Sequence, residues 1–125
     1  MMVLWVMAAG GLGSGARYLV GQWAFNAIGP QFPYGTVIVN LVGCFALGFV
    51  AQLATAGALS QEARLAIGTG FLGGFTTYSS FNQETLTLFA SGATGAAVLN
   101  VAITLAGGLA AGALGLTAGR LVTGS

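Results

Sequence analysis

Apolar residues fill almost the whole chain, and charged residues interrupt them at only a few positions. The uncharged stretches cover residues 18–61, 65–83 and 85–119, and a further apolar stretch precedes Arg17. A helix needs about 20 apolar residues to cross a bilayer core of about 30 Å. The pattern therefore predicts an all-α integral membrane protein, with four transmembrane helices in one domain that covers residues 1–125.

Turn and cap signals place the boundaries of these four helices. The predicted helices cover residues 3–25, 35–54, 60–90 and 94–122. The sequence Gly29-Pro30-Gln31-Phe32-Pro33 forms the first turn, because proline cannot continue a helix without strain. Ser60 is a candidate N-cap of the third helix. An even number of spans places both termini and the 55–62 loop on the same side of the membrane.

The third helix contains a run of glycine and hydroxyl residues, Gly73-Gly74-Phe75-Thr76-Thr77-Tyr78-Ser79-Ser80-Phe81. We expect this run to break the helix near residues 73–77. Carbonyls freed at the end of the first half favour a cation, and the hydroxyls can cap the second half. Non-helical backbone at membrane depth is tolerated only where protein or water surrounds it. The break is therefore the candidate functional site, and its residue types indicate ion handling.

The composition excludes several classes of function. Of 125 residues, 56% are hydrophobic and 4% are charged, and the chain contains no histidine, lysine or aspartate. A nucleophile paired with a histidine or lysine base is impossible, so an enzyme is the least supported class. Cys44 is the only cysteine, which excludes a disulfide framework or a multi-cysteine metal site within one chain. A net charge of +1 is too small to indicate a surface that binds nucleic acid.

The few charged residues suggest the mode of assembly and leave two interpretations open. Arg64 and Arg120 lie near the side of the termini and Arg17 nearer the other, which is a weak orientation signal. We therefore expect insertion in both orientations and an antiparallel homodimer. Glu84 is either a functional intramembrane carboxylate or an anchor near a helix end. Arg17 either attracts anions toward a vestibule or extends toward the interface and pairs with Glu84.

Uncharged hydrogen-bond donors and aromatic rings accompany the break. Asn40 lies in the second helix, and Asn100 and Thr104 share a face of the fourth. Such donors either replace the water of a small anion or join helices to one another. Tyr78 and Phe81 project from one face of the second half-helix, and the electropositive edge of an aromatic ring can face an anion. The combination favours a polar path for an ion over helix packing alone.

These motifs resemble the Fluc/CrcB family of small fluoride channels over essentially the whole chain. The similarity is carried by residues 10–18, residues 35–43 and residues 70–81 followed by Glu84. The resemblance implies a fluoride-selective passive channel that exports fluoride across the inner membrane of a microbial cell. It also implies a dual-topology, antiparallel homodimer in membrane lipid, with two pores lined by both subunits and a central structural sodium ion.

The resemblance also assigns roles to individual residues. The sodium ligands would be the backbone carbonyls of Gly73 and Thr76. The fluoride pore would be lined by Asn40, Thr77, Tyr78, Ser80, Phe81, Asn100 and Thr104. The chain departs from the family pattern at Tyr78, where phenylalanine is common, and at Asn100, where tyrosine is frequent. Both departures keep donor chemistry, so they bear on conduction rate and selectivity more than on function.

Two other classes of membrane protein compete with a channel. A small dual-topology, proton-coupled multidrug transporter also has four spans, but it needs a carboxylate in its binding chamber, commonly in the first span. The first predicted helix contains Arg17 and no acid. A non-conducting structural subunit of a larger complex would explain the many glycines but would leave the break and its donors without a purpose.

Overall fold

The computed structural model describes residues 1–125, and the chain is helical apart from its turns and one interruption. The elements are α1 (Met2–Ala27), α2 (Tyr34–Thr55), α3 (Gln61–Arg64), η1 (Leu65–Leu72), α4 (Gly73–Phe75), α5 (Tyr78–Ala90), α6 (Thr94–Ala102), η2 (Ile103–Gly107) and α7 (Gly108–Thr123). The two η elements are π-helical segments within longer helices, which the sequence pattern did not predict.

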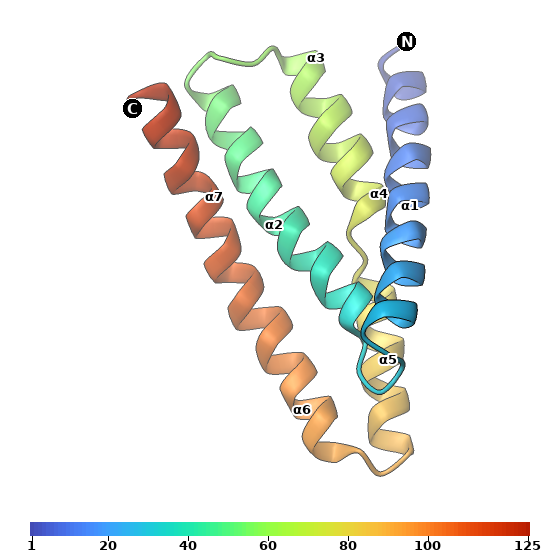
Figure 1. Cartoon of the computed structure of the whole chain (residues 1–125). Coiled ribbons are helices and arrows are strands. Elements are labelled where there is room, and N and C mark those ends of the chain that lie inside the picture. Colours follow the sequence, from blue (N-terminus) through green and yellow to red (C-terminus); the bar gives the residue numbers. More distant parts are fainter.

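The predicted four-helix organisation is confirmed. Three continuous helices are long and apolar enough to cross a membrane, namely α1, α2 and the rod Thr94–Thr123 that joins α6, η2 and α7. The fourth segment, Gln61–Ala90, is divided into two halves, α3–η1–α4 and α5. Figure 1 shows both termini at the end of the molecule where α3 begins, as the even number of spans predicts. Ser60 caps α3, because its hydroxyl accepts a hydrogen bond from the N–H of Ala63 over 3.1 Å.

The predicted break is confirmed and is shorter than expected. Gly73 and Gly74 remain helical in α4, and only Thr76 and Thr77 leave the helix, with extended backbone angles (φ −85°, ψ 159° and φ −154°, ψ 111°). The helix restarts at once because the Thr77 hydroxyl accepts a hydrogen bond from the N–H of Ser80 and so caps α5. Two residues of extended chain therefore separate two helices at membrane depth.

Glycines hold the helices close together in pairs. α1 packs against η1 and α4, α2 packs against α7, and α5 packs against α6. A methyl group at Gly13 would collide with the carbonyl of Phe71, and one at Gly115 would collide with the carbonyl of Phe45. Small residues permit this approach, and dispersion contacts between backbones then hold membrane helices together.

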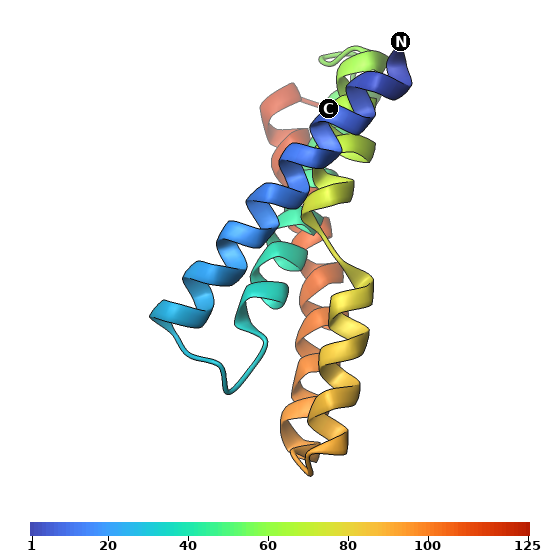
Figure 2. The ribbon, with the colours of Figure 1, turned by 90° about the vertical axis from the view of Figure 1, so that its right-hand side faces the viewer.

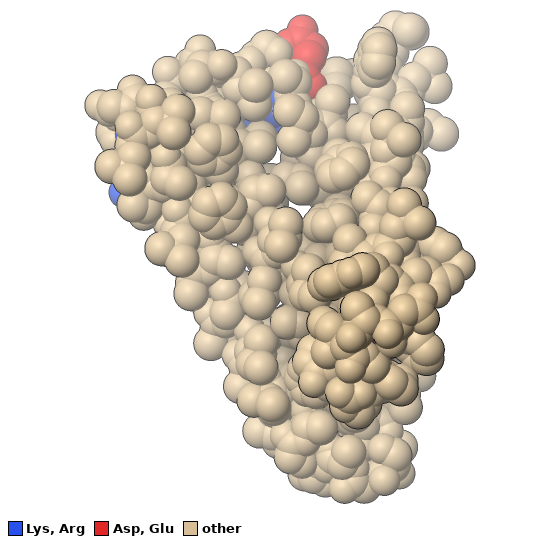
Figure 3. Space-filling view, in the orientation of Figure 1, with Lys and Arg blue, Asp and Glu red and all other residues tan.

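The helices do not form a closed bundle at every depth. In Figure 2, the lower ends of α1 and α2 diverge from α5 and from the rod that contains α6. Figure 3 shows that the charged side chains visible from this side all lie in the upper part of the molecule, near the termini. The remainder of that face is uncharged, as expected for a surface in contact with lipid or another apolar surface.

Candidate functional site

The side chain of Asn40 holds the extended segment of the break from α2. Its Nδ2 donates to the carbonyl of Thr77 over 3.1 Å, and its Oδ1 accepts from the N–H of Thr77 over 2.7 Å. Asn40 is 9% exposed. The amide therefore bonds both backbone groups of one residue, as a neighbouring β-strand would, and replaces hydrogen bonds that an unbroken helix would make.

The break redirects the N–H groups that would normally satisfy the carbonyls of the first half-helix. In an unbroken helix, the Thr77 N–H would bond the carbonyl of Gly73 and the Ser80 N–H would bond that of Thr76. Here the Thr77 N–H bonds Asn40 and the Ser80 N–H bonds the Thr77 hydroxyl. The carbonyl of Thr76 accepts no hydrogen bond within the chain. Carbonyl dipoles at the end of a half-helix thus remain available to a positive charge.

Tyr78 and Phe81 project from the same face of α5, as the sequence predicts. Their ring centroids are 5.7 Å apart and the ring planes are tilted by 53°. Phe81 is 7% exposed, whereas Tyr78 is 75% exposed. One ring therefore forms part of the folded subunit, and the other extends from it beside the break.

A hollow of about 280 Å³ lies on one side of the break and brings together most of the predicted site residues. It is lined by Asn40, Gly43, Cys44, Leu47, Gly68, Leu72, Gly73, Thr76, Thr77, Tyr78, Phe81, Thr104 and Leu105. Both π-helical segments contribute to it, η1 through Gly68 and Leu72 and η2 through Thr104 and Leu105. Such segments are frequent at functional sites because the extra residue redirects the side chains around it.

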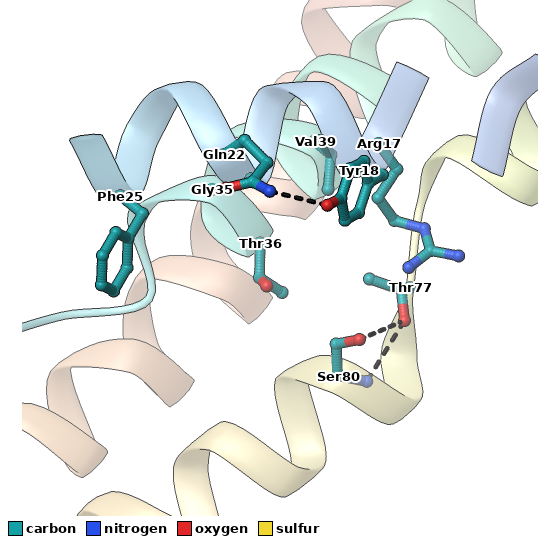
Figure 4. Close-up of a pocket in the computed structure, with 10 residues that line it drawn as sticks. Arg17, Tyr18, Gln22, Phe25, Gly35, Thr36, Val39, Thr77 and Ser80 are labelled. Carbon is teal, nitrogen blue, oxygen red and sulfur yellow. Dashed lines mark hydrogen bonds between the residues drawn. The ribbon is translucent and has the colours of Figure 1, made fainter. Parts of the chain in front are cut away.

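A second, more polar hollow of about 400 Å³ lies between α1, α2 and the start of α5. Its lining includes Arg17, Thr36, Thr77 and Ser80, whose side chains face one space in Figure 4. Arg17 is held there because its Nε donates to the carbonyl of Gly74 over 3.0 Å. Thr77 lines both hollows, so the extended segment of the break is shared by the two cavities.

The structure does not contain the Arg17–Glu84 pair that was one interpretation of these residues. Arg17 is instead bonded to the end of the first half-helix. Glu84 faces the turn between α1 and α2, where it lines two smaller hollows of about 160 and 190 Å³ that also contain Pro30 and Pro33. Its Oε1 is buried and has no hydrogen-bond partner. Glu84, the only acidic side chain after the break, therefore forms no ion pair with Arg17.

Asn100 lies behind the hollows, and Thr104 is the one predicted pore residue to which it is bonded. It is fully buried, at 0% exposure, and its Nδ2 donates to the hydroxyl of Thr85 over 2.9 Å. It lines none of the five hollows. Thr104 shares its helix face, as predicted, and donates to its Oδ1 over 3.5 Å.

Sequence reasoning missed two groups at the site, the carbonyl of Gly74 and Thr36, and one buried group behind it, Thr85. A backbone carbonyl leaves no signal in the residue pattern, so the Gly74 contact could not be found in advance. The signal for Thr85 is its position four residues after Phe81, on the same helix face. Thr36 lies one turn before Asn40 and could have been found by the same rule.

Comparisons with known proteins agree on one family. Residues 4–116 match the family described as CrcB-like protein, Camphor Resistance (CrcB). A protein of Sorangium cellulosum named fluoride-specific ion channel FluC is 45% identical over 122 residues, which cover 96% of each chain. Relatives of the same name include one from Roseiflexus sp., 45% identical over 98% of this chain and 99% of the relative. Another, from Rhizobium etli, is 50% identical over 74% of each chain.

Proposed function

The chain belongs to the CrcB-like family of multi-pass membrane channels, and from this premise we propose that it is a fluoride-selective passive channel that exports fluoride from the cell. The observation that carries the proposal is the hollow at the helix break. Amide, hydroxyl and aromatic-edge groups gather there, from Asn40, Thr77 and Phe81, at a depth where an interrupted helix is tolerated only beside protein or a water-filled path.

The residue types at the break suit a small, strongly hydrated anion. Fluoride gives up its water only where several donors replace it, and the hydroxyls of Thr77 and Ser80 and the amide of Asn40 are donors of this kind. The rings of Tyr78 and Phe81 present electropositive edges and exclude water. A larger chloride ion would gain less from the same groups. No lysine is present to trap the ion, so it can also leave.

Arg17 and Glu84 would act at the mouth of the path. The Arg17 guanidinium lies beside Thr77 in the polar hollow, where it raises the local concentration of anions. The hydrogen bond to the Gly74 carbonyl keeps the Arg17 side chain beside the break, so the guanidinium attracts an anion but stays in place when the anion moves on. Glu84, farther along α5, bounds the hollows near the α1–α2 turn and limits how far anions accumulate there.

We propose that two copies assemble as an antiparallel homodimer with dual topology and two pores. The support is the open side of the break, where Tyr78 is 75% exposed and the Thr76 carbonyl has no partner. Such backbone cannot face lipid, because an unsatisfied polar group in hydrocarbon costs several kcal/mol (roughly 2–7). A second copy of the chain, placed with its break against the first, covers both breaks at once.

A structural sodium ion at the centre of this dimer would be held by the carbonyls of Gly73 and Thr76. The residues fit this role, because the Thr76 carbonyl accepts no hydrogen bond and the Thr77 N–H is withdrawn from Gly73 by Asn40. When bound, the ion would supply positive charge to carbonyl dipoles that otherwise repel each other. The chain itself keeps these carbonyls free by bonding Asn40 to the extended segment.

Fluoride efflux from liposomes, measured with a fluoride electrode and with chloride as the comparison ion, tests the proposed function. We expect efflux of fluoride and not of chloride, and a large reduction in the variant Phe81→Ala. Phe89→Ala is the matched control, since Phe89 lies on the same helix but is 44% exposed and lines none of the hollows. Equal efflux of the two anions by the wild-type protein, or unchanged efflux in Phe81→Ala, would contradict the proposal.

A further inference from the structure

A chain of buried hydrogen bonds connects α6 to the carbonyl of Phe81. Asn100 donates from Nδ2 to the Thr85 hydroxyl over 2.9 Å, and Thr85 donates from that hydroxyl to the Phe81 carbonyl over 2.7 Å. All three residues are buried, at 0% exposure for Asn100 and 7% each for Thr85 and Phe81. The chain thus runs from the last transmembrane rod to the first turn of α5, which carries the aromatic pair.

Asn100 is buried by its own subunit. It lines no hollow, and its side-chain amide is already bonded to Thr85 and Thr104. Association with a second copy can only remove more surface from contact with water and ions. An ion therefore does not reach Asn100 unless α5 moves away from α6.

We propose that Asn100 and Thr85 are positioning residues for the ion path and make no contact with the ion. The inference rests on the proposed channel function. The Thr85 hydroxyl accepts from Asn100 on α6 and donates to the Phe81 carbonyl within α5, so rotation of α5 about its axis would break the bond from Asn100. α5 begins at Tyr78, directly after the extended residues, and packs against α6, to which the bond from Asn100 to Thr85 is its only side-chain hydrogen bond. The bond from Asn100 to Thr85 thereby helps to set the direction in which the edges of the Tyr78 and Phe81 rings point.

The test compares Thr85→Val, which keeps the shape of the side chain and removes the hydroxyl, with Thr85→Ser, which keeps the hydroxyl. The control is Thr117→Val, because the Thr117 hydroxyl donates to the carbonyl four residues earlier over 2.9 Å but meets no second side chain. We expect Thr85→Val to slow fluoride efflux by about threefold to tenfold, the range of a lost neutral hydrogen bond. The ratio of fluoride to chloride efflux should fall with it, and Thr85→Ser should restore both.

Asn100→Leu and the double variant with Thr85→Val test whether the two residues act as one unit. If they do, the double variant conducts about as well as the worse single variant, because the second substitution has no remaining bond to remove. Asn100→Leu also serves as the test if Thr85→Val does not fold.

Two results would overturn the inference. One is slow efflux in Asn100→Leu with wild-type efflux in Thr85→Val, which would mean that the amide acts on the ion directly. The other is an equal effect of Thr85→Val and Thr117→Val, which would mean that any lost threonine bond has the same consequence. Wild-type protein without fluoride efflux would instead contradict the proposed function, so the two failures are distinguishable.

Discussion

Asn40→Ala removes the side chain that holds the extended segment of the break. The variant loses the bonds of 3.1 Å and 2.7 Å to the carbonyl and the N–H of Thr77 and leaves both groups without a partner in a half-buried position. Each neutral hydrogen bond contributes about 0.5–1.5 kcal/mol net, so the two together stabilise the held conformation by about 1–3 kcal/mol. The stranded groups add to this cost, because water does not reach them readily at membrane depth.

This free energy sets the expected loss of fluoride efflux. Since about 1.4 kcal/mol corresponds to a factor of ten, the equilibrium constant between the held and the released conformation of the break should fall by roughly fivefold to 150-fold. Fluoride efflux from liposomes should decrease by up to the same factor, because the segment that Asn40 holds lines both hollows. Thermal unfolding in detergent should show a smaller change, because α1, α2 and α7 do not depend on this contact.

Gln52→Ala is the matched control for Asn40→Ala. Gln52 is another amide on α2 with 9% exposure, but its Nε2 donates to the Ser125 hydroxyl at the C-terminus, away from the break. We expect Gln52→Ala to keep wild-type efflux. If both variants lose efflux equally, the amides act only through the general stability of the fold. If neither loses efflux, the extended segment does not need Asn40 and the argument fails.

Three further predictions follow from the structure. Replacing sodium by a large organic cation during purification should lower the dimer content and the fluoride efflux, whereas dimers that conduct fully without sodium would refute the proposed role of Gly73 and Thr76. Gly13→Ala should destabilise the subunit by about 1–3 kcal/mol through overpacking, while Gly11→Ala, which has open space within the chain, should leave subunit stability unchanged in denaturant titrations. Ser60→Ala should cost about 1 kcal/mol as a lost N-cap and leave the ratio of fluoride to chloride efflux at its wild-type value, because the cap lies far from the break.

The sequence predicted those features that depend on local chemistry. The four helices, the turn at 29–33 and the cap at Ser60 follow from apolar length, proline and a hydroxyl before a helix. The break was also predictable, because glycines and hydroxyls accumulate there. The residue types singled out Asn40 and Phe81, the resemblance to the family then assigned both to the pore, and the structure places them together in one hollow.

The features that escaped prediction depend on contacts between distant segments. Arg17 could bond either to Glu84 or to a backbone carbonyl, and only the packing of α1 against α4 selects the carbonyl of Gly74. The burial of Asn100 depends on how α5 lies against α6, which no periodicity reveals. The π-helical segments at Leu65–Leu72 and Ile103–Gly107 likewise have no residue signature in this chain.

The division of the third span has a consequence for how the protein enters the bilayer. α5 contains 13 residues, which span about 20 Å and therefore less than the hydrocarbon thickness of about 30 Å. Neither half of the span can cross the bilayer alone. The N–H and carbonyl groups of Thr77 would lack hydrogen-bond partners in lipid until Asn40 of α2 binds them. Stable insertion of this span therefore requires the preceding helices to be in the membrane already. A nascent chain that ends at residue 90 would also lack the rod Thr94–Thr123, against which α5 packs.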